Sequence, residues 1–408
     1  MAATTPALAE QLMGPLLALI VGVLLVDFYL RFIVNQPSIF SRFKALFLDA
    51  GPPNYFELTG VPAPKPLLNF DVDTAKPRPY RPFRWGYHQT MALKKLEPDY
   101  WLELESTYRE RVEQRKRLYA ENGKKLLDCL PGSEPACKEL MEMVIQFLCA
   151  RYPKQFRHDG RNGKFWNGIL REEYDTKTID PLIFLLNNVP EDFLLVEENE
   201  KTGLYEMRAG VACSALGWNV AEKIGRPMKE IHGAVPDYKK IEFSVDRFFT
   251  KLACDKPIQR GSWGLEIGQP VFLQPDDPHW RLRDIQKPDL RVEEIYLRVD
   301  WQTLRRLPRS NAIVFNYKVL FTPMTQFREE PFIPRLVAKV IREGNSGILN
   351  YKGTAHIAHK ALPALDTWAQ EQEEKGWVSK DWNVRTLDED PFFPGWNGDA
   401  MSKDREVA

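Results

Sequence analysis

An uninterrupted apolar run near the start of the chain constrains its structure more than any other feature. Residues 13–26 (MGPLLALIVGVLLV) are all apolar, glycine or proline, and the run resumes after Asp27 and continues past Arg31 to residue 34. Residues 13–34 therefore supply about the 20 residues that a helix needs to cross a bilayer. Asp27 and Arg31 are four residues apart and can pair on one helix face near the interface. We predict a transmembrane helix over 13–34, with an amphipathic or buried leader helix as the alternative.

The charges that flank this run predict its orientation. Glu10 precedes the run without any Lys or Arg, so the positively charged start of a signal peptide is missing. Arg31, Arg42 and Lys44 mark the other side. By the positive-inside rule, we expect a single-pass membrane protein whose large C-terminal part lies in the cytosol.

Composition excludes several classes of protein for the rest of the chain. The 408 residues carry 56 Lys and Arg against 56 Asp and Glu, so the formal net charge is zero. A balanced chain does not hold nucleic acid by bulk electrostatics, and we expect no nucleic-acid partner. The five cysteines form no C-x-x-C pair, which argues against a zinc ribbon or a thioredoxin-type centre and favours reduced, mostly buried thiols.

Changes of composition along the chain predict its domain organisation. Many prolines between residues 51 and 84 indicate an extended linker or a wrapping arm, because proline fixes φ and removes a donor. The polar C-terminus indicates a frayed tail. The expected parts are a short tail at 1–12, the anchor at 13–34, a Pro-rich linker or arm at 35–84, a folded domain at 85–387 and a polar tail at 388–408.

The folded region reads as an α+β protein. Strand-like segments cluster in the middle of the chain, and helical segments precede and follow them, which favours α+β over alternating β-α-β. The predicted strands are 193–197, 205–213, 295–301 and 312–321, with a turn at 199–203. The predicted helices are an exposed one at 100–121 and others at 139–151, 221–224, 245–252, 334–343 and 365–375, the last starting after Pro363.

No common catalytic motif is present, so single residues have to be weighed. The chain lacks a dinucleotide fingerprint, a P-loop, a nucleophile elbow, H-E-x-x-H and C-x-x-C-H. Among the six histidines, His356 and His359 are three residues apart and form a weak candidate metal pair. His232 lies between Pro227 and Pro236 with apolar neighbours, which suits a rigidly held ligand, but on this chemistry alone a core histidine is the better interpretation.

Four ordered groups of residues resemble one known family. They are 221–238 (AEKIGRP through IHGAVPDY), 247–263 (RFF, then KPIQRGSW), 297–308 (LRVDWQTLRRLP) and 87–102 (YHQTMAL, then DYWL). This pattern is similar to the haem-dependent oxidative N-demethylases of the catalytic alpha-subunit type, over roughly residues 80 to 365. The chain is identified as a membrane-anchored, fungal-like variant of that family.

The resemblance implies a fold, a cofactor and an activity. It implies a PAS-like antiparallel sheet with flanking helices that holds haem b and oxidises a small amine or a related metabolite with O2. No reductase motif is present, so the electrons would come from a separate reductase. A haem-binding PAS-like sensor or carrier without turnover, and a membrane-tethered interaction protein without haem, are the alternatives.

The same resemblance, together with the chemistry that haem needs, yields the candidate site. Haem needs an axial ligand, cations for its propionates and an apolar wall. His232 is the candidate iron ligand, Arg260 and Arg298 are candidates for propionate or substrate contacts, and Gln302 and Tyr238 are candidates to orient a ligand or to donate a proton. Structural ion pairs and packing are the alternatives for these residues. The rival iron ligands are His88, His158, Cys213 and Cys254.

Overall fold

The computed structural model describes residues 52–86 and 91–387. The chain divides into two compact units, one comprising residues 1–53 and 159–163 and the other comprising residues 54–158 and 164–408. The predicted anchor at 13–34 and the predicted tail at 388–408 lie outside the described residues. Within the described ranges, no helix combines the length and the apolar character that a membrane span requires.

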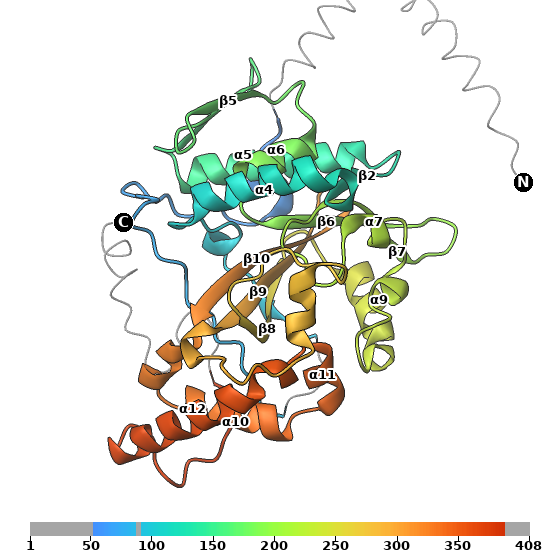
Figure 1. The fold of residues 1–408 in the computed structure, drawn as a ribbon. Coiled ribbons are helices and arrows are strands. Elements are labelled where there is room, and N and C mark those ends of the chain that lie inside the picture. Colours follow the sequence, from blue (N-terminus) through green and yellow to red (C-terminus); the bar gives the residue numbers. More distant parts are fainter. Residues whose placement is uncertain (1–51, 87–90, 388–408) are drawn as a thin grey trace, which may run out of the picture. The chain divides into compact units, whose positions relative to one another are not determined.

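A seven-stranded antiparallel sheet forms the centre of the described part of the second unit (Figure 1). Its spatial order is β1-β8-β9-β10-β6-β7-β2, and every neighbouring pair is antiparallel. The strands are β1 (Lys94–Lys95), β2 (Leu127–Cys129), β6 (Asp192–Glu198), β7 (Tyr205–Val211), β8 (Ile258–Ile267), β9 (Ile295–Arg306) and β10 (Ile313–Pro323). A second, small sheet consists of three strands in the order β3 (Phe156–Asp159), β4 (Lys164–Asn167) and β5 (Glu172–Asp175). The α+β class predicted from the sequence is confirmed.

The strand register decides which side chains share a face of the large sheet. Directly opposite residues of antiparallel strands point to the same side. Arg260 on β8 pairs with Gln302 on β9, which pairs in turn with Tyr317 on β10. We call the side that carries these three residues the site face and the opposite side the helix face.

Helices cover the helix face and bury its apolar side chains. Trp263, Leu297 and Trp301 pack there with the apolar stripe of α10, and α12 lies along α10 (Figure 1). Phe193 and Val314 join a second cluster with α5 and α6. The helices of the chain are α3 (Tyr55–Thr59), α4 (Tyr108–Asn122), α5 (Glu134–Arg151), α6 (Pro181–Asn188), α7 (Val220–Lys223), α8 (Met228–Ile231), α9 (Glu242–Lys251), α10 (Ile333–Glu343), α11 (Ser346–Tyr351) and α12 (Ala355–Glu374), with 3-10 turns η1 (Pro98–Tyr100), η2 (Gly123–Lys125), η3 (Tyr238–Lys240), η4 (Pro278–Arg283), η5 (Val292–Glu294) and η6 (Met324–Glu329).

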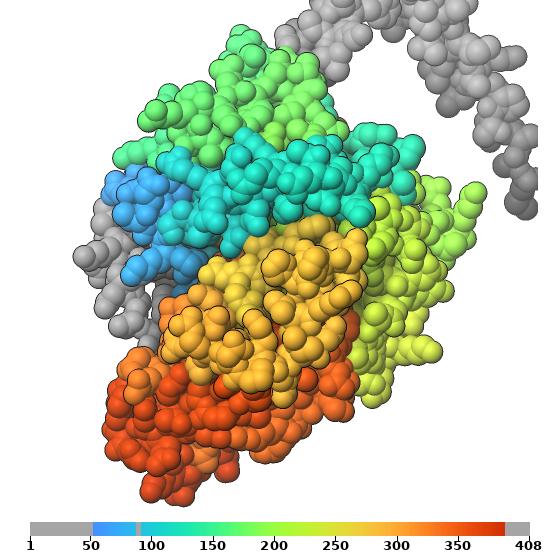
Figure 2. Space-filling model, viewed as in Figure 1, coloured from blue at the N-terminus to red at the C-terminus, as the bar shows by residue number. Residues whose placement is uncertain are grey.

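The short helices α7 to α9 cover one end of the site face. Leu304 and Ile313 of the sheet are buried in one cluster with Met228 of α8 and Phe249 of α9. The long connection between β8 and β9, gold in Figure 2, lies on the surface beside this yellow-green segment. Beyond the cluster, Arg260 and Gln302 are only half-buried. The helices α7 to α9 therefore leave a polar strip of the site face, around Arg260 and Gln302, that a ligand can occupy.

Parts of the Pro-rich segment between residues 54 and 84 pack against the domain. Arg81 is buried and forms an ion pair with Glu330, with Nη2 and Oε1 2.6 Å apart. The ring of Tyr80 stacks on Trp301 at a centroid distance of 3.9 Å. Residues 52–84 therefore contribute to the core of the domain, as a wrapping arm does.

The structure confirms the predicted strands, but several helices begin or end at other residues than predicted. β6 and β7 are joined through the predicted turn, where Gly203 has a φ of 68°, a conformation that glycine adopts without strain. The helix predicted at 100–121 begins at Tyr108, and it is not simply exposed, because Tyr108, Val112 and Arg115 are buried. β9 extends five residues past its predicted end, to Arg306.

The last predicted helix starts earlier than expected. α12 begins at Ala355, and Pro363 lies inside it instead of at its start. A proline in a helix interior costs about 3 kcal/mol because it removes a hydrogen bond and crowds the preceding turn. Ile357, Ala361 and Leu365 bury their side chains in the helix-face cluster, and this packing offsets that cost.

Candidate functional site

Two polar rows cross the site face side by side. The first contains Arg260, Gln302 and Tyr317, and the second contains Ser262 and Asp300. Tyr317 is buried, which raises the pKa of its phenol well above the ordinary value. The sequence predicted Arg260 and Gln302 as site residues, and the register places them next to each other.

Arg260 is a cation without a counter-ion among the described residues. Its guanidinium has no hydrogen-bond or ion-pair partner within residues 52–86 and 91–387, and its Nε is fully enclosed. Burial lowers the pKa of Arg260 to about 10, and the positive charge of Arg84 contributes to this shift as a smaller second cause. A buried charge is costly unless it is paired, so an anionic ligand would be strongly stabilised here.

His232 follows α8 directly, and its ring is held on two sides. Its Nδ1 lies 2.9 Å from the carbonyl oxygen of Met228, and its ring stacks on Tyr238 at a centroid distance of 4.8 Å and an angle of 11°. Burial lowers the pKa of His232, and the charges of Lys223 and Arg260 add to this effect. The ring is therefore neutral at pH 7. Because Nδ1 donates its proton to the carbonyl, Nε2 keeps a free electron pair.

Tyr238 lies beside this histidine, in η3. Its ring is buried, and its hydroxyl has no hydrogen-bond partner in the described part of the chain. Burial, helped by the charges of Asp246 and Glu242, raises the pKa of Tyr238 to about 12. The phenol therefore keeps its proton at neutral pH and can donate it in a hydrogen bond.

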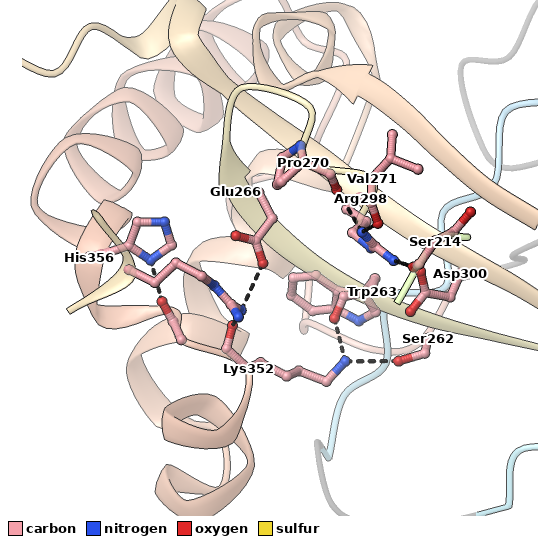
Figure 3. Close-up of polar contacts among 12 residues, drawn as sticks. Ser214, Ser262, Trp263, Glu266, Pro270, Val271, Arg298, Asp300, Lys352 and His356 are labelled. Carbon is pink, nitrogen blue, oxygen red and sulfur yellow. Dashed lines mark hydrogen bonds and ion pairs between the residues drawn. The ribbon is translucent and has the colours of Figure 1, made fainter. Parts of the chain in front are cut away.

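Arg298 is held by the protein itself (Figure 3). Its Nε donates to Asp300 at 3.0 Å, and its Nη2 donates to the carbonyl of Ser214 at 2.5 Å. Its Nη1 donates to the carbonyls of Pro270, at 2.7 Å, and Val271, at 3.2 Å. Each nitrogen of this fork already serves a protein acceptor. We therefore assign Arg298 a structural role, joining three chain segments, in place of the predicted contact with a propionate or substrate.

Lys352 is a site residue that the sequence analysis missed. It follows α11, and its Nζ donates to Ser262 Oγ at 3.1 Å and to the carbonyl of Trp263 (Figure 3). Burial lowers the pKa of Lys352 to about 8, although Asp300 opposes this shift. A Tyr-Lys-Gly sequence after a short helix carries no signal of its own, and only the fold brings this lysine over β8.

The charges around Lys352 do not balance. Within the described residues, this neighbourhood holds four cations and two carboxylates, namely Arg260, Arg283, Arg298, Lys352, Glu266 and Asp300. The two carboxylates are paired, Glu266 with Arg283 and Asp300 with Arg298. Two positive charges remain, and a ligand with two acidic groups would neutralise them.

Three of the rival iron ligands lie in surroundings that suit a metal less well, and the fourth, His88, cannot be compared. His158 lies in the small sheet, where its Nε2 is 3.2 Å from Thr176 Oγ1, and His88 lies outside the described residues. Burial raises the pKa values of Cys213 and Cys254, which disfavours their thiolates. The two histidines of the predicted metal pair bond to different carbonyls, and the described residues contain no cluster of three or more metal-ligating side chains.

A cavity of about 310 Å³ lies next to this neighbourhood, under the connection that follows β8. His356 lines it, with its Nδ1 bonded to the carbonyl of Gly353 and its Nε2 without a partner in the described chain (Figure 3). Glu266 and Arg283 line it too, but His232 and Arg260 do not. It is therefore separate from the histidine and from the free arginine.

The fold and the site together define a class of protein. It is an α+β protein whose antiparallel sheet carries, on one face, an arginine with no counter-ion among the described residues, and its charge acts on a neutral histidine that follows α8. Over residues 92–362, the chain matches the family described as haem-dependent oxidative N-demethylase, alpha subunit-like. The chain belongs to this family. The matched range contains His232, Tyr238, Arg260, Arg298 and Gln302.

Proposed function

We propose that this protein is a haem-dependent oxidoreductase that binds haem b on the site face with His232 as the iron ligand. The observation that carries the proposal is the state of the His232 ring. Its Nδ1 is engaged by the Met228 carbonyl, so Nε2 is the nitrogen that can coordinate a metal. A backbone hydrogen bond of this kind fixes the tautomer and the orientation of a ligating imidazole.

The remaining residues of the site face fit the rest of a haem group. Arg260 would pair with a propionate, since its guanidinium is a buried donor without an acceptor in the described residues. The two uncompensated positive charges match the two propionates of haem b. Leu304, Phe315 and Leu194 form an apolar row next to the polar ones, which suits a porphyrin edge.

The chain's own residues would then position a substrate and supply a proton. Tyr238 holds a proton on its hydroxyl at neutral pH and would donate a hydrogen bond to a bound molecule. Gln302 would orient the same molecule with its amide, and Arg298 would hold Asp300 in place. Bound haem would supply the activation of O2, with electrons from a separate reductase. The family's activity supports a small amine or a related metabolite as the substrate.

We further propose that the domain is PAS-like and that residues 13–34 anchor it to a membrane with the domain in the cytosol. The long antiparallel sheet with helices packed against it supports the first part. The apolar length and the Arg and Lys residues that follow it support the second.

Haem titration of the full chain in detergent, followed by assays of turnover, tests this function. We expect a Soret band that saturates at one haem per chain, and formaldehyde release with O2 consumption when a reductase and a panel of methylamines are added. Saturable haem binding without turnover would indicate a sensor or carrier. A chain that binds no haem would contradict the proposal and favour an interaction protein.

A further inference from the structure

Two thiols meet at the edge of the large sheet that β2 forms. Cys129 ends the edge strand β2, and Cys137 lies in the first turns of α5. Their sulfur atoms are 3.7 Å apart, which is hydrogen-bonding distance for sulfur. The sequence analysis expected five separate reduced thiols, because no C-x-x-C spacing is present, and the β2–α5 turn creates this contact instead.

The environment gives the two thiols different roles. Cys129 is half-buried, whereas Cys137 is 2 % exposed. The hydrogen bond between them lowers the pKa of Cys129 and raises that of Cys137. Cys129 is therefore the more accessible and more acidic thiol, and Cys137 lies behind it within hydrogen-bonding distance. A reactive thiol with a second thiol in contact is the arrangement that redox-sensitive cysteine pairs use.

We propose that Cys129 and Cys137 form a reversible disulfide, with a small hydroperoxide such as hydrogen peroxide as the oxidant. Rotation of the side chains is needed to bring two sulfurs in contact to the bonding distance of about 2.05 Å. The proposal rests on the geometry of this pair alone and is independent of haem binding.

The reaction proceeds in two balanced steps. Cys129 first releases its thiol proton, and the thiolate attacks one oxygen of hydrogen peroxide. The O–O bond breaks, Cys129 becomes a sulfenic acid, and the departing hydroxide takes up the released proton and leaves as one water. The sulfur of Cys137 then attacks the Cys129 sulfur, the S–O bond breaks, and the hydroxide takes the Cys137 proton and leaves as a second water. The two thiols lose two electrons and two protons in total, and peroxide gains them. An external dithiol reverses the change.

Thiol mapping of the full chain tests the proposal. The protein is purified under reducing conditions, freed of reductant, treated with hydrogen peroxide, unfolded in an alkylating agent and digested for mass spectrometry. We expect the loss of two thiols, a cross-linked peptide joining Cys129 to Cys137, and alkylated thiols at Cys149, Cys213 and Cys254. Dithiothreitol should restore both thiols.

Two variants distinguish the proposed order of events. In Cys137→Ser, Cys129 should stop at the sulfenic acid and become labelled by dimedone, whereas Cys254→Ser, which removes a half-buried thiol elsewhere, should leave the cross-link unchanged. If Cys137→Ser does not fold, mapping of the wild-type chain still decides. Oxidation of Cys254 before Cys129, or a Cys129 sulfinic acid or intermolecular disulfide without the Cys137 cross-link, would overturn the proposal.

Discussion

Arg260 on β8 and Gln302 on β9 lie directly opposite each other across an antiparallel pair. They are 42 positions apart in the sequence, yet the register brings a half-buried arginine, which has no counter-ion among the described residues, next to a neutral amide on one sheet face. This pair marks the middle of the polar strip that the helices α7 to α9 leave open. The strip is where we expect the haem propionates and the substrate.

The first prediction concerns Arg260. Arg260→Gln should weaken haem binding by roughly 10- to 100-fold, since a hydrogen bond to a charged group contributes about 1.5–3 kcal/mol. The same change should not destabilise the haem-free chain, because it removes an unpaired buried charge. Haem titration and urea unfolding measure the two effects. Arg291→Gln, at an exposed arginine, is the control, and equal haem affinity in both variants would exclude Arg260 as a propionate partner.

The second prediction separates Arg298 from Arg260. Arg298→Ala should destabilise the chain by roughly 3 kcal/mol, because it leaves three carbonyls and the partly exposed Asp300 without their charged donor, and a hydrogen bond to a charged group contributes about 1.5–3 kcal/mol. Arg298→Lys should not restore stability, since a single ammonium cannot bridge three chain segments. Urea unfolding without haem measures both variants. A stable Arg298→Ala chain that loses only haem would show that Arg298 is a ligand contact after all.

The third prediction is a pH dependence that originates in Lys352. The folded-state pKa, about 8, is lower than the ordinary value of 10.5, so between these values the unfolded chain binds more protons than the folded one. The contribution of Lys352 to stability should therefore rise as pH increases from 8 to 10.5. Lys352→Met should remove this rise relative to wild type, whereas Lys256→Met, at an exposed lysine, should keep it. Identical pH profiles for wild type and Lys352→Met would show that the amine is not perturbed.

The fourth prediction concerns the N-terminal apolar run. The protein in native membranes should resist carbonate extraction, and added protease should digest the large domain from the cytosolic side of sealed vesicles. Both results follow from a single span at 13–34 with a positively charged cytosolic flank. Carbonate release of the intact protein, or protection of the domain inside vesicles, is incompatible with this topology.

The sequence allowed four of the seven strands of the large sheet to be predicted, because strands with β-branched and aromatic residues carry a local signal, whereas β1, β2 and β8 were not predicted. The signal for β9 fades after Trp301, where Gln302, Arg305 and Arg306 are polar, and the pairing with β8 and β10 shows that the strand continues. The start of α12 was predicted too late for a related reason, because Pro363 was taken to mark the beginning of the helix. Tertiary packing, which the local sequence does not contain, offsets the cost of the proline.

The candidate site could be predicted only in part. His232, Tyr238, Arg260 and Gln302 lie in or next to recognisable motifs, and the fold gives each of them a free or enclosed polar group consistent with a ligand site. Arg298 lies in the clearest motif, but its partners come from residues 214, 270 and 271, so its structural role depends on long-range contacts. Lys352 could not be predicted as a site residue for the same reason, because its partners Ser262 and Trp263 are far from it in the sequence.

The His232 side chain provides the most direct test of the haem assignment. Full-length His232→Ala and His158→Ala are purified and titrated with haem, and each absorption spectrum is recorded before and after imidazole is added. We expect His232→Ala to lose the wild-type Soret position and haem content, and imidazole to restore the band by occupying the vacated ligand position. His158→Ala should match wild type, because that histidine bonds Thr176 in the small sheet. A wild-type spectrum in His232→Ala, with the band lost in His158→Ala or His88→Ala, would contradict the assignment.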